Sequence, residues 1–146
     1  MKANIYIASS IKALKPSNGV VGYVIETQTS KGPATLTQFG KVKEVSKNAA
    51  EILALKNALS RINIKCELDL WSENRYICSV FSQGWLKNWE TTGFLKGNGE
   101  EVVDAEKWRE VACLLNGRGI LTHPQEEHEY KGYLEREVER RAKKYV

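Results

Sequence analysis

The chain has 146 residues, of which 42% are hydrophobic and 27% are charged, and its formal net charge at pH 7 is +4. This length and composition are typical of one soluble globular domain, so we expect a single domain over residues 1–146. No segment approaches the roughly 20 apolar residues that a membrane span needs, and the mildly basic charge permits nucleic-acid binding without requiring it.

The N-terminal third is predicted to form three strands. Residues 4–9 (NIYIAS), 20–29 (VVGYVIETQT) and 35–45 (TLTQFGKVKEV) are rich in β-branched and aromatic side chains. Turn residues separate the strands, with Pro16 and Gly19 before the second and the stretch KGPA before the third. We therefore expect an antiparallel meander of three strands.

The next part of the chain is predicted to alternate helices with a strand. Apolar residues recur at helical spacing in residues 46–62, which predicts a helix. A strand is predicted at residues 65–72 (KCELDLWS), followed by one or two short helices within residues 74–94 and another helix at residues 104–116.

The chain ends with a short predicted strand at residues 119–123 (GILTH) and a charged helix within residues 126–146. The apolar stripe of this helix contains Tyr130, Leu134 and Val138. The predicted order is therefore β-β-β-α-β-α-α-β-α. A meander followed by β-α-β units implies an α/β fold, with a mixed five-stranded sheet flanked by helices.

The cysteines bear on the cellular compartment. Cys66, Cys78 and Cys113 contain no CxxC pair, which argues against a zinc site, and their odd number fits reduced thiols better than a disulfide framework. The N-terminus lacks the long apolar run of a signal peptide. We expect a cytoplasmic protein that is monomeric and does not associate with membranes.

Carboxylates at strand ends and helix starts are the residues that suggest chemistry. Glu51 lies near the start of the first predicted helix, within an apolar face, and Glu73 directly follows the fourth predicted strand. Two magnesium ions at a phosphodiester need oxygen ligands of this kind, converging from distant parts of the chain. From position alone, however, a glutamate near a helix start is more often a partner of the helix dipole.

Six short motifs in order resemble the type 1 ribonuclease H family almost from end to end. They are IASS, SNGVVGYVIE, NAAEILALKNAL, SENRY, WLKNWETTGF and DAEKWREV. Each match is weak alone, but their order and spacing together favour a ribonuclease H-like fold. The resemblance implies a nuclease that hydrolyses the RNA strand of an RNA–DNA hybrid with Mg²⁺ or Mn²⁺.

Residue by residue, the resemblance implies that the family's second and third metal-binding acids are Glu51 and Glu73. The fourth is Glu135, with Glu137 and Glu129 as alternatives on or near the last helix. The family's first acid, an aspartate that bridges both metals, is replaced by Ala8. We therefore expect any metal to bind weakly.

Two explanations of Ala8 are open, an introduced inactivating substitution and natural divergence. Ser9 and Glu73 also depart from the family pattern, which favours divergence. A third case is that Ser9, Ser10 or a water replaces the lost ligand.

The family's loop histidine, which assists catalysis or product release, looks like His123, with His128 as the alternative.

The resemblance also implies a nucleic-acid-binding surface. Its predicted members are Lys47, Asn48, Asn74, Trp85, Asn88 and Trp89. Aromatic side chains there can pack on sugars or bases, whereas at helical spacing either tryptophan can equally be a core residue. The family's basic residues after the second tryptophan are replaced by Glu90, Thr91 and Thr92, which predicts weaker phosphate binding.

We therefore predict a divergent ribonuclease H that acts on RNA–DNA hybrids, with activity that is weak or lost. The alternative is a non-catalytic module that binds hybrid or double-stranded RNA. A different nuclease of the same fold, such as an integrase or resolvase, fits the order of motifs less well.

Overall fold

The computed structural model describes residues 2–13 and 15–145, and it contains one five-stranded sheet with helices on both faces. The strands are β1 (Lys2–Ser9), β2 (Ser17–Thr29), β3 (Gly32–Val45), β4 (Glu67–Ser72) and β5 (Ile120–Pro124). The helices are α1 (Lys47–Leu59), α2 (Arg75–Ser82), α3 (Trp85–Thr92), α4 (Ala105–Leu115) and α5 (Lys131–Lys144).

The predicted α/β fold with a mixed five-stranded sheet is confirmed, with two refinements. The segment 74–94 forms two helices, α2 and α3, which are separated by Gly84 in the left-handed conformation at φ 73°. The last helix begins at Lys131 rather than near residue 126. Tyr130, the residue before this helix, anchors its start to the sheet, because the Tyr130 hydroxyl donates to Glu26 on β2 at 2.6 Å.

The strand order β3-β2-β1-β4-β5 places β1 at the centre of the sheet. β1 pairs antiparallel with β2 and parallel with β4, and β4 pairs parallel with β5. The carboxyl ends of β1 and β4 therefore lie at the same edge, where the chain leaves in different directions. In open α/β sheets such a point is where ligands bind.

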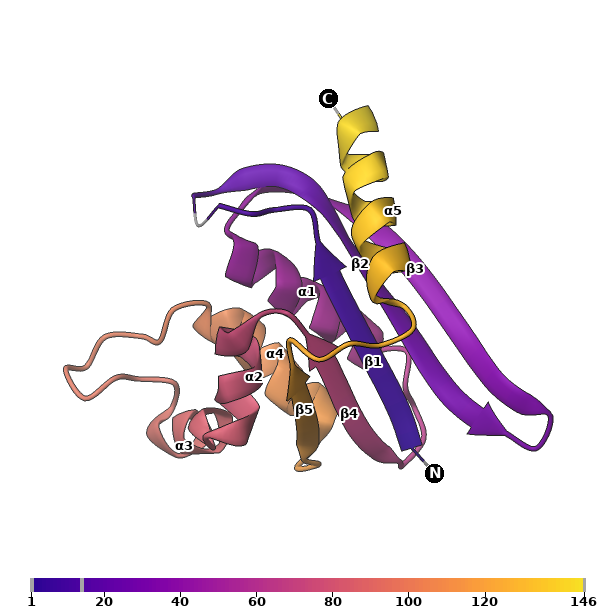
Figure 1. Ribbon diagram of the computed structural model, residues 1–146. Helices are drawn as coiled ribbons and strands as arrows, with labels where there is room; N and C mark the ends of the chain where they lie inside the picture. Colours follow the sequence, from indigo (N-terminus) through magenta and orange to yellow (C-terminus); the bar gives the residue numbers. More distant parts are fainter. Residues whose placement is uncertain (1, 14, 146) are drawn as a thin grey trace.

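The two faces of the sheet carry different side chains. Along β1, Ile5 and Ile7 point into the main core beneath α1 and α4, whereas Tyr6 and Ala8 face α5. Figure 1 shows α5 in front of the sheet and α1 and α4 behind it. Each fully buried Ile or Leu side chain contributes about 1.5–3 kcal/mol relative to its exposed state, so the main core dominates the stability of the domain.

Within residues 2–13 and 15–145, no helix is long and apolar enough to cross a bilayer. All three cysteines are free thiols. Cys78 is buried on α2, and burial raises the pKa of its thiol to about 11.

The α5 face of the sheet is closely packed beside the end of β1. Gly22 on β2 pairs with Ala8 on β1 and with Phe39 on β3. A Cβ atom at position 22 would lie 2.5 Å from the Phe39 ring. The glycine is therefore required by the aromatic ring that lies over it.

Gly22→Ala is expected to lower the free energy of unfolding by about 1–3 kcal/mol, because overpacking forces neighbouring side chains out of their rotamers. Urea unfolding measures the loss. Gly40→Ala is the matched control on β3, since a Cβ there would meet nothing within 4 Å. Equal losses in the two variants would contradict this packing.

Candidate active site

A cavity of about 240 Å³ lies at the carboxyl ends of β1 and β4. Its apolar floor is formed by Ile7, Ala8, Ile11 and Leu134. The charged side chains around it are Glu51, Glu73, Glu135, Lys12, Lys47 and Lys131. A larger hollow of about 760 Å³ near residues 62–67 and 114–118 has Glu67 as its one carboxylate, so it is not the candidate site.

Glu51 reaches the cavity from α1. The helix begins after Ser46, whose hydroxyl accepts a hydrogen bond from the Ala49 amide at 3.1 Å, as the N-cap requires. Glu51 lies one turn further along, at the edge of the core, and only 3% of its surface is exposed. A carboxylate buried to this degree needs a partner.

The partner of Glu51 is Asn74, at the N-cap of α2. The Asn74 side-chain NH₂ group donates to Glu51 Oε2 and to Asn48 Oδ1, both at 2.9 Å. Its carbonyl oxygen accepts from the Ile77 amide at 3.2 Å. Asn74 is buried and each of its side-chain hydrogens has a protein acceptor, so its side chain positions Glu51, and its contact with nucleic acid stays a prediction.

Burial raises the pKa of Glu51 above its ordinary value. The hydrogen bond from Asn74 opposes this change, and so do the charges of Lys47 and Lys12. The cavity therefore holds a carboxyl group whose charged form is less favourable than it would be in water, which is a common feature of functional sites.

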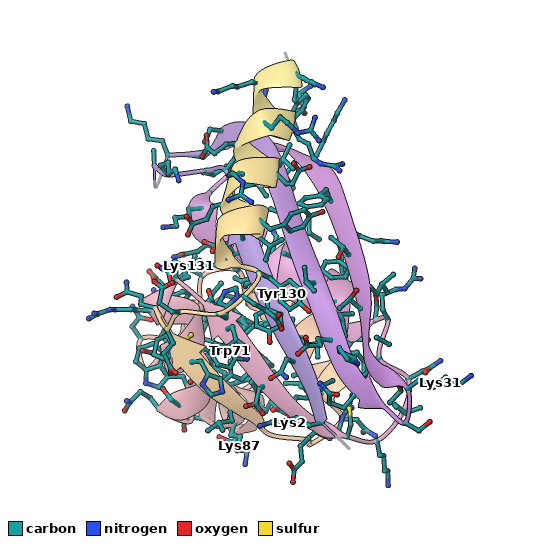
Figure 2. The ribbon with its side chains drawn as sticks, turned by 45° about the vertical axis from the view of Figure 1, so that its right-hand side comes forward. Lys2, Lys31, Trp71, Lys87, Tyr130 and Lys131 are labelled. Atoms are coloured by element: carbon teal, nitrogen blue, oxygen red, sulfur yellow. The ribbon has the colours of Figure 1, made fainter. Side chains whose placement is uncertain are left out.

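Glu73 follows β4 and is half-exposed. Its Oε1 lies 3.4 Å from the Lys131 ammonium, which also contacts Glu127 Oε1 at 3.1 Å. The contact with Glu127 raises the pKa of Lys131 most, and the contact with Glu73 raises it further. Figure 2 shows Lys131 at the lower end of α5, beside Tyr130.

Ala8 supplies no ligand atom to the cavity, and neighbouring serines are engaged elsewhere. Ser9 Oγ accepts from the Ile11 amide at 3.0 Å, and Ser10 Oγ accepts from the Val20 amide at 2.9 Å. Both hydroxyls thus hold the turn after β1. Ser9 also lines the cavity. Because a hydroxyl oxygen has two lone pairs, the alternative that Ser9 or Ser10 replaces the lost aspartate stays a prediction.

The predicted acids share the cavity without forming a metal site. Glu51, Glu73 and Glu135 all line it, from α1, the end of β4 and α5. In the described part of the chain, however, no three His, Cys, Asp or Glu side chains are grouped closely enough to hold a metal ion. The predicted three-glutamate metal cluster is therefore not assembled in this structure.

The two alternatives to Glu135 lie outside the residues that line the cavity. Glu137 pairs with Arg140 at 2.7 Å and with Arg141 at 3.3 Å, and these hydrogen bonds lower the pKa of Glu137 to about 2. Glu129 lies beside Glu26, and their hydrogen bond raises the pKa of Glu129.

The structure separates the two candidate histidines. His123 lies on β5, where its Nε2 is 2.7 Å from Asp69 Oδ2 and its ring stacks on Trp71 at 3.9 Å. This places His123 away from the cavity, as the partner of a buried carboxylate. His128 lines the cavity, so the geometry favours this alternative for the loop histidine.

His128 has a defined protonation pattern. Its Nδ1 accepts a hydrogen bond from the Tyr130 amide at 3.2 Å, which leaves the proton of the neutral ring on Nε2. Burial lowers the pKa of His128, which favours this neutral form.

The residues of the predicted nucleic-acid surface differ in exposure. Trp85 on α3 is 40% exposed, whereas Trp89 is half-buried and packs against Phe94 and Trp108 at ring distances of 6.4 and 6.0 Å. Asn88 is exposed and Lys47 and Asn48 are half-buried. Trp85 is thus the aromatic residue available for stacking, and Trp89 belongs to the edge of the core.

Lys12 and Lys131 are cavity residues that sequence reasoning missed. Lys131 is the first residue of α5, where the macrodipole favours acidic side chains over basic ones. The sequence did not determine where this helix begins, so it gave no signal for Lys131.

Comparisons with known proteins bear on this site. The RNase H family model matches residues 2–128. A ribonuclease H of Acetivibrio thermocellus is 36% identical over 77 residues, which span 53% of this chain and 52% of that relative, or about half of its length. A ribonuclease H of Lachnoclostridium phytofermentans is 24% identical over 136 residues, which span 87% of this chain and 86% of that relative.

Solved structures with the same fold extend the match over the whole domain. LC9-RNase H1, a type 1 RNase H with the type 2 active-site motif, superposes with a TM-score of 0.77 at 14% identity, over 99% of this chain and 74% of that one. The foamy viral protease-reverse transcriptase in complex with RNA/DNA hybrid gives 0.69 at 15% identity, over 98% of this chain and 19% of that one. At these identities the likeness shows the fold.

Glu51→Gln is expected to stabilise the protein at neutral pH by about 1 kcal/mol, the usual size of a single-substitution effect. Because the folded-state pKa of Glu51 is raised, the folded protein binds this proton more tightly than the unfolded chain does. Wild-type stability therefore falls as pH rises through the folded-state pKa, and glutamine removes this loss while keeping an acceptor for Asn74.

Urea unfolding of wild type and Glu51→Gln at pH 8 and at about pH 4 measures the effect, which should shrink towards the lower pH. Glu90→Gln, at an exposed position of α3, is the control and should show no such trend. A glutamine variant that is less stable than wild type at pH 8 would refute the raised pKa.

Proposed function

Because the chain belongs to the RNase H family, we propose that it binds RNA–DNA hybrids and that its hydrolysis of the RNA strand is weak or lost. The observation that carries this proposal is the cavity at the end of β1. There Ala8, which offers neither charge nor oxygen, lies with Glu51 and Glu73, and Glu73 is already paired with a lysine.

Duplex recognition is supported by fold and surface together. A structural neighbour of the same fold is the foamy viral enzyme in complex with RNA/DNA hybrid. In the present chain, exposed Trp85 can stack on a sugar or base, and Lys47 can meet a phosphate. Asn48 uses its oxygen to accept from Asn74, and its NH₂ group has no acceptor among the described residues, so it can donate to the duplex.

Weak hydrolysis is supported by the poor fit of the cavity to divalent metal. Members of this family generally use divalent metal ions, and such ions need several converging oxygen ligands. Glu51 is held by Asn74, Glu73 by Lys131, and position 8 has no ligand atom. Deleting a group that contacts the reacting centre costs several powers of ten in rate, so the loss is expected to be large.

A non-catalytic module for hybrid or double-stranded RNA is the second candidate. The ion pair between Lys131 and Glu73 favours it, since a cavity already neutral in charge can serve binding alone. Cleavage assays separate it from the first candidate. We propose further that the protein acts as a monomer in the cytoplasm, where its three free thiols would stay reduced.

Trp85→Ala is expected to weaken binding of a short RNA–DNA hybrid about tenfold, because stacking on one aromatic side chain contributes about 1–3 kcal/mol per base. Fluorescence polarisation of a labelled hybrid at low salt measures the dissociation constant. Tyr133→Ala is the matched control, because Tyr133 is also 40% exposed but lies on α5, across the sheet. Equal affinities for wild type and Trp85→Ala would exclude Trp85 from the binding surface.

Ala8→Asp is expected to raise hybrid cleavage by about tenfold over wild type, which corresponds to about 1.4 kcal/mol in activation free energy. The added carboxylate restores an oxygen ligand in the cavity that Glu51 and Glu73 line. Cleavage of a labelled RNA strand in Mg²⁺ and then in Mn²⁺ is the assay.

Ala8→Asn tests whether charge is the cause, because it has the same shape without the charge and should not raise cleavage. Robust cleavage by wild type that Glu51→Gln abolishes would contradict the proposal of weak or lost hydrolysis. If Ala8→Asp folds and shows no gain, the non-catalytic module is favoured.

A further inference from the structure

The Lys131 ammonium lies beside Glu73, one of the three carboxylates that line the cavity. It contacts Glu73 Oε1 at 3.4 Å and Glu127 Oε1 at 3.1 Å. Among the described lysines that pair with a carboxylate, Lys131 has the least exposed side chain, at 23% compared with 35% for Lys56. Its two partners are more open, because the side chains of Glu73 and Glu127 are 48% and 86% exposed.

The position of Lys131 is fixed by its neighbours. Tyr130 donates to Glu26 at 2.6 Å, and Leu134, one turn along α5, is 1% exposed. The start of α5 is thus anchored to the sheet on both sides of the lysine. The helix dipole disfavours a cation at this end, so the lysine is held there by the two carboxylates rather than by the helix.

The formal charges of the cavity lining sum to zero, because it contains three glutamates and three lysines. Two of these lysines also contact carboxylates outside the lining, Lys131 with Glu127 at 3.1 Å and Lys12 with Glu139 at 3.3 Å. Lys47 and Lys12 both lower the pKa of Glu51 by their charge. A divalent cation is bound by an excess of negative charge in a set of oxygen ligands, and this cavity has no such excess.

We propose that the Lys131 ammonium replaces a divalent cation in this cavity, so that Glu73 is neutralised by the protein itself and divalent metal is excluded. A consequence, which rests on the proposed function, is that the cavity's lysines meet a backbone phosphate of the duplex directly. Hybrid binding then needs no divalent ion. The exclusion of metal itself is independent of whether any duplex binds.

The test is Mn²⁺ binding to the free protein, followed by electron paramagnetic resonance of unbound Mn²⁺. The dissociation constant of wild type for Mn²⁺ is expected to exceed about 1 mM, which is the weak end of the range for calcium sites built from carboxylates. Lys131→Met is expected to bind at least about tenfold more tightly, because it removes a positive charge a few ångströms from the carboxylates. Paramagnetic broadening of amide signals should then centre on residues 8, 51 and 73.

Lys56→Met is the matched control. Lys56 lies on α1, away from the cavity lining, and it pairs with Glu110 on α4. Lys131→Gln serves as a second variant if circular dichroism shows that Lys131→Met does not fold. Saturable Mn²⁺ binding by wild type at residues 8, 51 and 73 would overturn the proposal. So would an affinity gain in the Lys131 variants no larger than in Lys56→Met.

The role in duplex binding is tested separately. Hybrid affinity of wild type should be the same in EDTA and in Mg²⁺ at matched ionic strength, whereas a requirement for Mg²⁺ would overturn direct phosphate contact. Absence of any hybrid binding would refute the proposed function and leave the Mn²⁺ result standing.

Discussion

Asn74 connects α1 to the junction of β4 and α2, although its partners on α1 lie 23 and 26 residues earlier in the chain. Its side-chain oxygen caps α2, while its NH₂ group binds Asn48 and Glu51 on α1. The main-chain amide of Asn74 donates to Ser72 at the end of β4. Without the hydrogen bond from Asn74, Glu51 would be a buried carboxylate that lacks a donor, and this costs more free energy than the hydrogen bond itself contributes.

A second anchor on the other face of the sheet determines where α5 starts. Buried Glu26 accepts from Tyr130 at 2.6 Å and lies 3.5 Å from the Tyr6 hydroxyl. Burial and the nearby Glu26 carboxylate raise the pKa of both tyrosines, so both hydroxyls remain donors at neutral pH. Glu51 and Glu26 are thus two buried glutamates, each of which accepts hydrogen bonds from side chains of a neighbouring element.

Much of this fold could be predicted from periodicity, because strand and helix patterns are local properties of the chain. The shared location of Ala8, Glu51 and Glu73 also followed from matching motifs in order. The role of Asn74 could not be predicted, since its partners lie 23 and 26 residues away. Residue type alone does not distinguish an asparagine that positions other side chains from one that contacts nucleic acid. The contact of His123 could not be predicted for a similar reason, because its partner Asp69 lies 54 residues earlier and becomes a neighbour only through the pairing of β4 with β5.

The strand order leaves two edges, and they govern how the sheet meets another chain. β3 is long, but its sequence places Pro33, Lys41 and Lys43 along the edge, and Glu44 turns at φ 51°. β5 has five residues and ends in Pro124. Proline, lysine and short length are the features by which natural sheets resist the addition of a foreign strand. At high protein concentration, the sheet edges of this chain are therefore expected to resist edge-to-edge aggregation with other copies.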